Sequence, residues 1–199
     1  MLIRRWMTKE PITIEPGHTL AQAKSKMEKG GFRRLPVTAN GALVGIITDR
    51  DLRQHAGAHE HTRVDVAMTA PVITVTPDMV LDQAANLFAK HKVGGFPVLE
   101  HGKLVGIITA IDMMRAFGQV LGTGEEGVSR IDLAFTGSSF DLAMIAELVG
   151  LSSGEVLGMG SYKGGHKGQT VYVRVRSDDA KRIAGMLDKN NFIVLGIHQ

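Results

Sequence analysis

Two successive series of apolar and polar positions in the first 118 residues predict the same order of elements, namely strand, helix, strand, strand, helix. A β-rich run at 12–14, and again at 73–75, precedes a stretch in which apolar residues recur at helical spacing. A strand that ends in Pro-Val follows, then a turn at Asn40-Gly41 or His101-Gly102, then the apolar run Leu-Val-Gly-Ile-Ile. The apolar positions of the first helix in each series are Leu20, Ala23 and Met27, and Leu81, Ala84, Ala85 and Phe88.

The two series form an internal repeat with an offset of 61 residues. The offset aligns Thr48 with Thr109 and Asp51 with Asp112, and it needs no gap from position 3 to position 51 of the first copy. Of the 45 pairs from 7/68 to 51/112, 19 are identical. A match of this extent at one fixed offset indicates two copies of one structural unit. The last helix of each copy begins at a repeated string, GIITDRD at 45–51 and GIITAID at 106–112.

The pattern changes after the second copy. A glycine-rich, acidic connector (GQVLGTGEEGVSR) leads to predicted strands at 131–136, 155–162, 170–176 and 192–197 and predicted helices at 140–149 and 178–189. Ser138-x-x-Asp141 is a capping box for the first of these helices. The string KGGHKG lacks the strand and helix that flank a phosphate loop, so we interpret it as a hairpin turn. The order β-α-β-β-α-β in about 70 residues is that of a ferredoxin-like unit.

Composition narrows the class of protein. With 44% hydrophobic and 22% charged residues among 199, the chain has the composition of a soluble globular protein. No apolar run approaches the roughly 20 residues that cross a bilayer, and the N-terminus lacks a signal-peptide core, so we expect a cytoplasmic protein with no membrane partner. The absence of cysteine excludes disulfides, a thiol nucleophile and thiolate metal sites. The net charge of +3 is dispersed, and we expect no nucleic-acid partner.

The repeated marks resemble a known family. Met-Thr before the first strand, the x-x-Pro-Val strand and G-h-h-T-x-x-D, where h is apolar, occur in this order twice. The paired copies resemble tandem cystathionine-β-synthase (CBS) domains in the arrangement called a Bateman module. The C-terminal part resembles an ACT domain, and the whole order is similar to the bacterial acetoin utilization protein family. Where ACT domains that bind amino acids carry an Asp-Arg-Pro-Gly-like loop, this chain has TGSSFD.

This resemblance implies an α/β (α+β) fold in which two CBS domains form a pseudo-twofold pair, followed by a ferredoxin-like βαββαβ ACT-like domain. We assign residues 1–60 to CBS domain 1, 61–120 to CBS domain 2, 121–128 to a linker and 129–199 to the ACT-like domain. The resemblance also implies a homodimer, formed through the CBS pair, the ACT-like domain or both. It implies a regulatory role in acetoin or related carbon metabolism, exerted on a protein target that the sequence does not name.

The Thr-x-x-Asp string has two interpretations. As a capping box, the Thr hydroxyl caps the helix and the Asp carboxylate reaches back to the cap N–H, which stabilises each helix by about 0.5–2 kcal/mol without a ligand. As a binding site, the helix N-terminus and the hydroxyl hold a phosphate, and the carboxylate one turn inside accepts both hydroxyls of a ribose. In the second interpretation the groups together describe a site for a nucleoside phosphate.

The resemblance to CBS pairs implies the second use. The ligand is then an adenine nucleotide (AMP, ADP or ATP) that acts as a regulator and not as a catalytic cofactor, and S-adenosylmethionine remains an alternative. The candidate residues are Thr48 or Thr109 for phosphate, Asp51 or Asp112 for ribose, and Ile12 or Ile73 for adenine.

The two copies differ where the charge of a phosphate must be neutralised. Three arginines of the first copy align with neutral residues of the second, and these pairs are Arg33 with Gly94, Arg34 with Gly95, and Arg50 with Ile111. Arginines are most often solvated surface charges, which is one interpretation. In nucleotide-binding CBS pairs, however, a pseudo-twofold axis sets the strands of one copy against the motif of the other. The arginines then serve the phosphates of a nucleotide whose ribose binds Asp112, and we expect two unequal sites.

No motif indicates catalysis. The chain has no H-E-x-x-H, no G-x-S-x-G and no acidic cluster with metal spacing, so we expect no catalytic residue, no metal and no enzymatic activity. His55, His59, Glu60 and His61 lie in the connector between the copies, and we interpret them as a solvated linker instead of a metal site. Two alternatives remain, which are an accessory subunit of a metabolic enzyme and a purely structural module.

Overall fold

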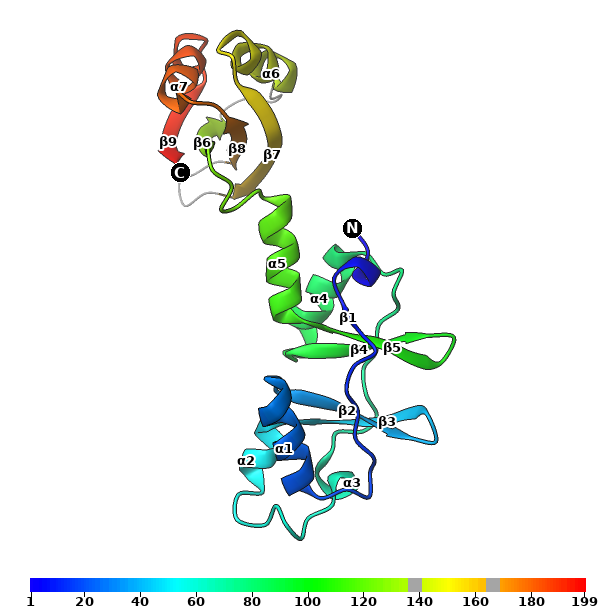
Figure 1. The fold of residues 1–199 in the computed structure, drawn as a ribbon. Helices are drawn as coiled ribbons and strands as arrows, with labels where there is room; N and C mark the ends of the chain where they lie inside the picture. The colour runs from blue at the N-terminus through cyan, green and yellow to red at the C-terminus, as the bar shows by residue number, and fades with distance from the viewer. Residues whose placement is uncertain (136–140, 164–168) are drawn as a thin grey trace. The chain divides into compact units, whose positions relative to one another are not determined.

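The computed structural model describes residues 1–135, 141–163 and 169–199. The chain forms two compact units, Met1–Ala116 and Phe117–Gln199, and each is described by itself. The first unit contains both copies of the repeat, and the second contains the C-terminal sheet (Figure 1). The predicted mixed α/β fold is confirmed.

The first copy is built around the antiparallel pair β2 (Arg34–Ala39) and β3 (Ala42–Thr48). Helix α1 (Leu20–Gly30) precedes the pair, and helix α2 (Asp49–Gln54) follows it. The turn between the strands has positive φ at Asn40 and Gly41 (51° and 79°), as a two-residue hairpin requires. The predicted helix positions Leu20, Ala23 and Met27 are all buried in one apolar cluster with residues of both strands.

The second copy repeats these elements as α4 (Leu81–His91), β4 (Gly95–Glu100), β5 (Lys103–Thr109) and α5 (Ala110–Val120). Its strand register is the same, because Gly95 pairs with Thr109 as Arg34 pairs with Thr48. The Pro-Val dipeptide lies inside β2 and β4 and does not end them, which corrects the predicted strand ends. Helix α5 is longer than α2 by five residues, since they contain 11 and 6 residues.

The predicted strands at 12–14 and 73–75 are reduced to single bridges. Ile14 makes one parallel bridge with Val37, and Val75 makes the equivalent bridge with Val98. Prolines flank both runs at positions 11 and 16, and at 71 and 77. Because proline has no N–H to donate to a ladder, neither run extends into a regular strand.

The two copies exchange their leading segments. The 3₁₀ helix η1 (Ile3–Arg5) and strand β1 (Thr8–Lys9) lie on the second copy, where Thr8 pairs with Ile107 of β5. Helix α3 (Val64–Ala67) lies on the first copy, where the Val64 N–H donates to the His18 carbonyl. Ile3 and Val64, which are aligned by the repeat, both have 0% exposure. Each copy is therefore completed by the segment that precedes the other copy.

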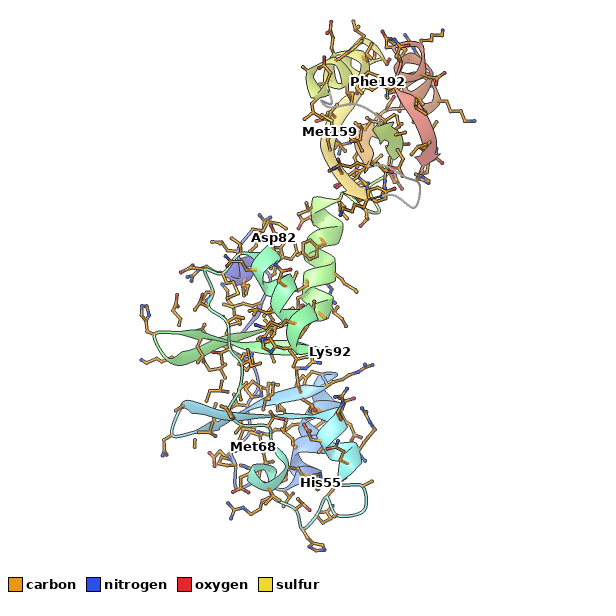
Figure 2. The ribbon with its side chains drawn as sticks, turned by 180° about the vertical axis from the view of Figure 1, so that it is seen from behind. His55, Met68, Asp82, Lys92, Met159 and Phe192 are labelled. Carbon is orange, nitrogen blue, oxygen red and sulfur yellow. The ribbon has the colours of Figure 1, made fainter. Side chains whose placement is uncertain are left out.

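The same exchange explains the glycine of the repeated string. A Cβ atom at Gly45 would lie 2.3 Å from Sδ of Met68, which is labelled in Figure 2. A Cβ atom at Gly106 would lie 2.6 Å from Sδ of Met7. The methionine of each Met-Thr dipeptide thus packs on the glycine of the string, and a larger residue there would have to displace it.

The second unit is a four-stranded antiparallel sheet in the order β7-β8-β6-β9. Its elements are β6 (Val128–Phe135), α6 (Leu142–Leu151), β7 (Glu155–Lys163), β8 (Gln169–Arg176), α7 (Ala180–Lys189) and β9 (Ile193–His198). Both helices pack on one face of the sheet (Figure 1), and Met159 and Phe192, labelled in Figure 2, lie against the core between them. The predicted β-α-β-β-α-β order is confirmed.

The helix starts in this unit differ from the predicted ones. Helix α6 begins at Leu142 because Asp141 is its N-cap and accepts a hydrogen bond from the Met144 N–H. Asp141 therefore caps the helix itself and is not the third residue of the predicted capping box. Ser138 lies outside the described residues, as does most of the predicted KGGHKG turn. Helix α7 begins at Ala180 and not at 178, because Asp179 is its N-cap.

The face of this sheet opposite the helices carries a polar cluster. Asp132 is only 7% exposed. Its carboxylate accepts hydrogen bonds from Arg130 Nε at 2.6 Å and from the Tyr162 hydroxyl at 3.0 Å. The Arg130 guanidinium lies over the rings of Tyr162 and Tyr172, with centroid distances of 5.2 and 4.7 Å. The hydrogen bond to Asp132 is the main cause of a raised Arg130 pKa. These side chains stabilise one another.

Candidate functional site

A cavity of about 760 Å³ lies between the two copies in the first unit. The first copy contributes Ile12, Arg33 and Arg34 to its lining, and the second contributes Thr109 and Asp112. Arg34 is the first residue of β2, and Thr109 ends β5 immediately before α5. The structure thus places five of the candidate residues together, with the strand of one copy against the motif of the other.

The Thr-x-x-Asp motif is a capping box in both copies. Oδ2 of Asp112 accepts hydrogen bonds from the backbone N–H of Thr109 at 2.9 Å and from its hydroxyl at 2.6 Å. Oδ2 of Asp51 accepts the same two bonds from Thr48 at 2.8 and 2.6 Å. The cap interpretation is therefore correct for both helices, and it leaves the second carboxylate oxygen of each Asp for other donors.

The second oxygen of Asp112 faces a residue that the sequence interpretation missed. Nη1 of Arg115 lies 3.7 Å from Asp112 Oδ1, and Arg115 also lines the cavity. The side chain of Arg115 is 74% exposed, so the pair is a weak one in water. The repeat alignment pairs Arg115 with Gln54 and could have identified it as a further cation that only the second copy carries.

The two cavity arginines have no counter-ion of their own. Within residues 1–135, 141–163 and 169–199, neither Arg33 nor Arg34 makes a side-chain hydrogen bond or an ion pair. Arg34 is half-buried, and this burial is the main cause of its lowered pKa. The positive charge of Arg33 lowers the pKa further, whereas the negative charges of Asp49 and Asp112 raise it. A half-buried guanidinium without a partner is costly, so the cavity is suited to an anion.

Ile12 gives the same cavity an apolar wall. Ile12 is 54% exposed, and the preceding residue, Pro11, also lines the cavity. Ala110 and Ile111 bring the N-terminus of α5 to the lining, where the positive end of the helix dipole adds to the charge of the arginines. Together these features offer an apolar surface, a carboxylate oxygen and a cationic region to one ligand.

Four candidate residues do not line this cavity. Thr48, Asp51 and Ile73 are the repeat equivalents of Thr109, Asp112 and Ile12, which do line it. Arg50 is exposed in the first turn of α2, at the position equivalent to Ile111. Arg50 therefore accompanies the motif of its own copy and does not line the cavity that contains Arg33 and Arg34.

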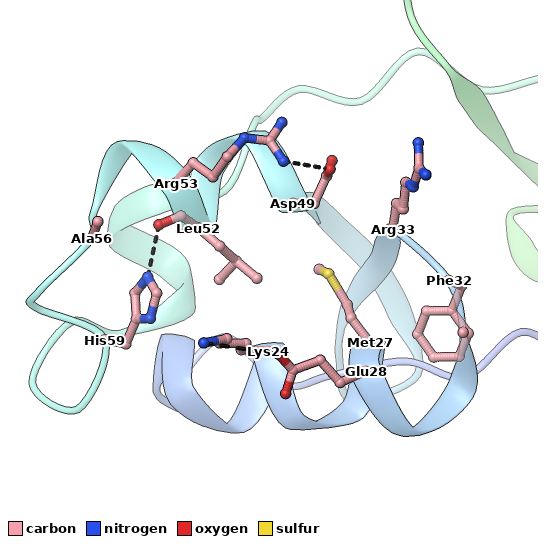
Figure 3. A pocket seen from close by; sticks show the side chains of 11 residues that line it. Lys24, Met27, Glu28, Phe32, Arg33, Asp49, Leu52, Arg53, Ala56 and His59 are labelled. Carbon is pink, nitrogen blue, oxygen red and sulfur yellow. Dashed lines mark hydrogen bonds and ion pairs between the residues drawn. The ribbon is translucent and has the colours of Figure 1, made fainter.

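A second cavity, of about 440 Å³, lies between α1 and α2, and Figure 3 shows its lining. Two of its cations are paired, since Arg53 Nη1 lies 2.7 Å from Asp49 Oδ2 and Lys24 Nζ lies 3.8 Å from Glu28 Oε1, whereas Arg33, which lines this cavity as well, has no such partner within the described residues. The hydrogen bond from Arg53 is the main cause of a lowered Asp49 pKa. An anion gains less beside Lys24 and Arg53 than beside Arg34, because those two cations already have partners.

Two of the linker histidines lie within hydrogen-bond distance of backbone carbonyl oxygens. His59 Nε2 lies 2.7 Å from the Leu52 carbonyl oxygen, as Figure 3 shows, and His55 Nδ1 lies 2.9 Å from the Asp51 carbonyl oxygen. Within the described parts of the chain, no group of three or more His, Cys, Asp or Glu residues is placed to hold a metal ion. The same parts contain no helix that is long and apolar enough to span a membrane.

Comparison with known proteins identifies the repeat. The family model of the CBS domain matches residues 3–57 and again 63–119. The CBS domain-containing protein YhcV of Bacillus subtilis is 32% identical over 114 residues, which are 56% of this chain and 81% of YhcV. An inosine-5′-monophosphate dehydrogenase of Korarchaeum cryptofilum is 32% identical over 139 residues, but these make up only 28% of that enzyme.

Solved structures show the same pair of domains. The CBS domain pair of protein MJ0100, in complex with 5′-methylthioadenosine and S-adenosyl-L-methionine, has a TM-score of 0.56 and 31% identity over 60% of this chain and 97% of its own. A putative acetoin utilization protein (AcuB) from Vibrio cholerae has a TM-score of 0.56 and 34% identity over 63% and 96%. CBSX2 in complex with AMP has a TM-score of 0.54 and 26% identity over 60% and 98%.

Proposed function

Since the chain belongs to the CBS-domain family and carries two CBS domains in tandem, we propose that it is a regulatory protein that binds an adenine nucleotide in the cavity between them. The observation that carries this proposal is the half-buried, unpaired Arg34 in the same cavity as Asp112. AMP, ADP and ATP each supply the anion that Arg34 lacks and the ribose hydroxyls that a carboxylate accepts.

Each cavity residue has a role in this proposal. Arg34 and Arg33 bind the phosphates, and the N-terminus of α5 adds its dipole. Asp112 accepts the ribose hydroxyls through Oδ1, because Oδ2 is held by Thr109. The adenine ring lies against Ile12, whose apolar surface is otherwise left in water.

A phosphate-free adenosine derivative is a second candidate, which the complex of the MJ0100 domain pair favours. 5′-Methylthioadenosine would use Asp112 and Ile12 but would leave Arg34 unpaired. S-adenosylmethionine carries a sulfonium cation that two nearby arginines repel. The charge of the cavity therefore favours the nucleotides.

The proposal extends to the rest of the chain. The C-terminal unit is an ACT-like domain, and the protein acts as a homodimer that passes the state of the CBS pair to this domain or to a protein target. A ligand can do so only if its affinity differs between two conformations of the protein. A role in acetoin or related carbon metabolism is supported by the likeness to AcuB, and a role as an accessory subunit of a metabolic enzyme is the alternative.

Titration of the full chain tests the proposal. Isothermal titration with AMP, ADP, ATP and S-adenosylmethionine should show saturable binding of at least one nucleotide without turnover. Replacing Asp112 with Ala should weaken that binding by about tenfold to hundredfold, the cost of charge-assisted hydrogen bonds. Asp51→Ala is the matched control and should change the affinity by less. A larger loss for Asp51→Ala would contradict the assignment, and no binding of any adenine nucleotide would contradict the function.

A further inference from the structure

The side chain of Arg34 lies over two glycines of the other copy. A Cβ atom added to Gly94 would lie 2.2 Å from Arg34 Nη2, and a Cβ atom added to Gly95 would lie 2.9 Å from Arg34 Cδ and 3.2 Å from Nη1. Real Cβ atoms essentially never come within 3.0 Å of another heavy atom, so the contacts at 2.2 and 2.9 Å could not form unless Arg34 moved. The place of the guanidinium therefore depends on the absence of side chains at Gly94 and Gly95.

The glycines provide space, and not an unusual backbone. Neither Gly94 nor Gly95 is among the residues with positive φ, so any residue could adopt their backbone conformation. The repeat aligns Arg33 with Gly94 and Arg34 with Gly95. Arg34 thus occupies space that a side chain at its own repeat equivalent, Gly95, would fill. The two copies are therefore asymmetric at this point.

The two glycines differ in what they contact. At Gly95 a Cβ would also meet the Ile108 carbonyl oxygen at 3.2 Å, which is backbone and cannot yield easily. At Gly94 the three nearest atoms all belong to the end of the Arg34 side chain, namely Nη2, Cζ and Nη1. A methyl group at position 94 would therefore move the guanidinium without removing its charge and without pressing on the backbone.

We infer that Gly94 is a positioning residue that sets the preference of the cavity for a phosphate-bearing nucleotide over adenosine, because it keeps the Arg34 guanidinium in its place. This inference rests on the proposed function. A guanidinium recognises a phosphate through two parallel N–H donors, so its orientation matters as well as its charge. Adenosine shares the base and ribose of AMP and lacks only the phosphate, which makes the ratio of the two affinities a measure of phosphate recognition alone.

The test is the affinity of the full chain for AMP and for adenosine, measured by titration calorimetry. In the wild type we expect AMP to bind at least about tenfold more tightly than adenosine. Gly94→Ala should reduce this ratio several-fold while the affinity for adenosine stays within about twofold. Gly17→Ala is the matched control, since a Cβ there has no atom within 4 Å, and it should leave the ratio unchanged.

A double-variant cycle separates positioning from a general structural effect. Arg34→Ala alone should reduce the ratio at least as far as Gly94→Ala, and Gly94→Ala combined with Arg34→Ala should reduce it no further. If Gly94→Ala fails to fold in a thermal unfolding check, Arg34→Lys replaces it, because lysine keeps the charge and loses the two-donor geometry; the ratio should again fall.

The outcomes distinguish the inference from the proposed function. If Arg34→Ala lowers the ratio and folded Gly94→Ala does not, Gly94 has no positioning role and the inference is overturned while nucleotide binding stands. If Arg34→Lys retains the full ratio, charge alone accounts for phosphate recognition and the inference is also overturned. If the wild type binds neither AMP nor adenosine, the proposed function is overturned, and the inference with it.

Discussion

Thr109 and Asp112 hold each other through one carboxylate oxygen, because Oδ2 of Asp112 accepts both the backbone N–H and the hydroxyl of Thr109. Thr48 and Asp51 make the same two bonds in the first copy, but neither of them lines the cavity. One local geometry thus serves both as a helix cap and, in the second copy, as part of the candidate nucleotide site. The two uses can be separated by comparing equivalent substitutions.

Thr109→Ala should lower both stability and nucleotide affinity. Loss of the cap should destabilise the first unit by about 0.5–2 kcal/mol, and the freed Asp112 carboxylate should cost affinity as well. Thr48→Ala is the control, since it removes the same cap in the other copy and should lower stability by a similar amount. Chemical denaturation gives the stabilities and calorimetry the affinities. Equal losses of affinity in the two variants would contradict the assignment to the second copy.

Gly106→Ala should destabilise the first unit more than Gly45→Ala. At Gly106 a Cβ would meet Met7 Sδ at 2.6 Å and the backbone oxygen of Thr8 at 3.0 Å, whereas at Gly45 all of the nearest atoms belong to the Met68 side chain. A methionine side chain can move aside, but a paired strand cannot, so we expect a cost of about 1–3 kcal/mol for Gly106→Ala. Denaturation followed by the fluorescence of Trp6, the single tryptophan, measures it. A smaller cost at Gly106 than at Gly45 would refute this account of the two contacts.

Asp132→Ala should destabilise the second unit. The substitution leaves the Arg130 guanidinium and the Tyr162 hydroxyl without their shared acceptor, which should cost about 2 kcal/mol. Both tyrosines of the chain, Tyr162 and Tyr172, lie in this cluster, so near-ultraviolet tyrosine signals follow the second unit while Trp6 follows the first.

Tyr162→Phe is the graded control for Asp132→Ala, because it removes one hydroxyl and should cost only about 1 kcal/mol. If the tyrosine transition of Asp132→Ala matches that of the wild type, the cluster does not stabilise the sheet.

Acid should weaken the contact between Arg53 and Asp49. The hydrogen bond from Arg53 lowers the pKa of Asp49, so the stability that the pair contributes is present above the ordinary pKa of an aspartate and is lost as the pH falls through the lowered value. Both side chains are more than one third exposed, which limits the contribution to about 0.3–0.5 kcal/mol. Arg53→Ala should raise the Asp49 pKa, as followed by carboxyl chemical shifts in an NMR titration; an unchanged pKa would rule out this cause.

The sequence predicted the repeated elements because each depends on local signals. The offset of 61 residues, the Asn40-Gly41 turn and the Thr-x-x-Asp caps are all short-range patterns, and the structure contains each of them. The two-residue strand Thr8–Lys9 was not predicted, because a strand of this length has no period, and periodicity does not identify the sheet that it joins.

The candidate site was only partly accessible from the sequence. The meeting of Arg34 with Asp112 depends on the pseudo-twofold arrangement of the copies, which came from the family resemblance and not from spacing. Arg50 was grouped with Arg33 and Arg34 because all three align with neutral residues, but an alignment does not record which side chains line the same cavity. Arg115 was missed although its difference from Gln54 was visible in the same alignment.

The exchange of leading segments has a consequence for any attempt to divide the pair. A cut after residue 60 would separate Ile3 from the second copy, where it is fully buried, and Val64 from the first. Each half would then expose an apolar slot and carry an unplaced apolar residue, an arrangement that favours reassociation of the fragments over independent folding. The smallest piece of this chain that we expect to fold with both sides of the cavity in place is accordingly the intertwined pair.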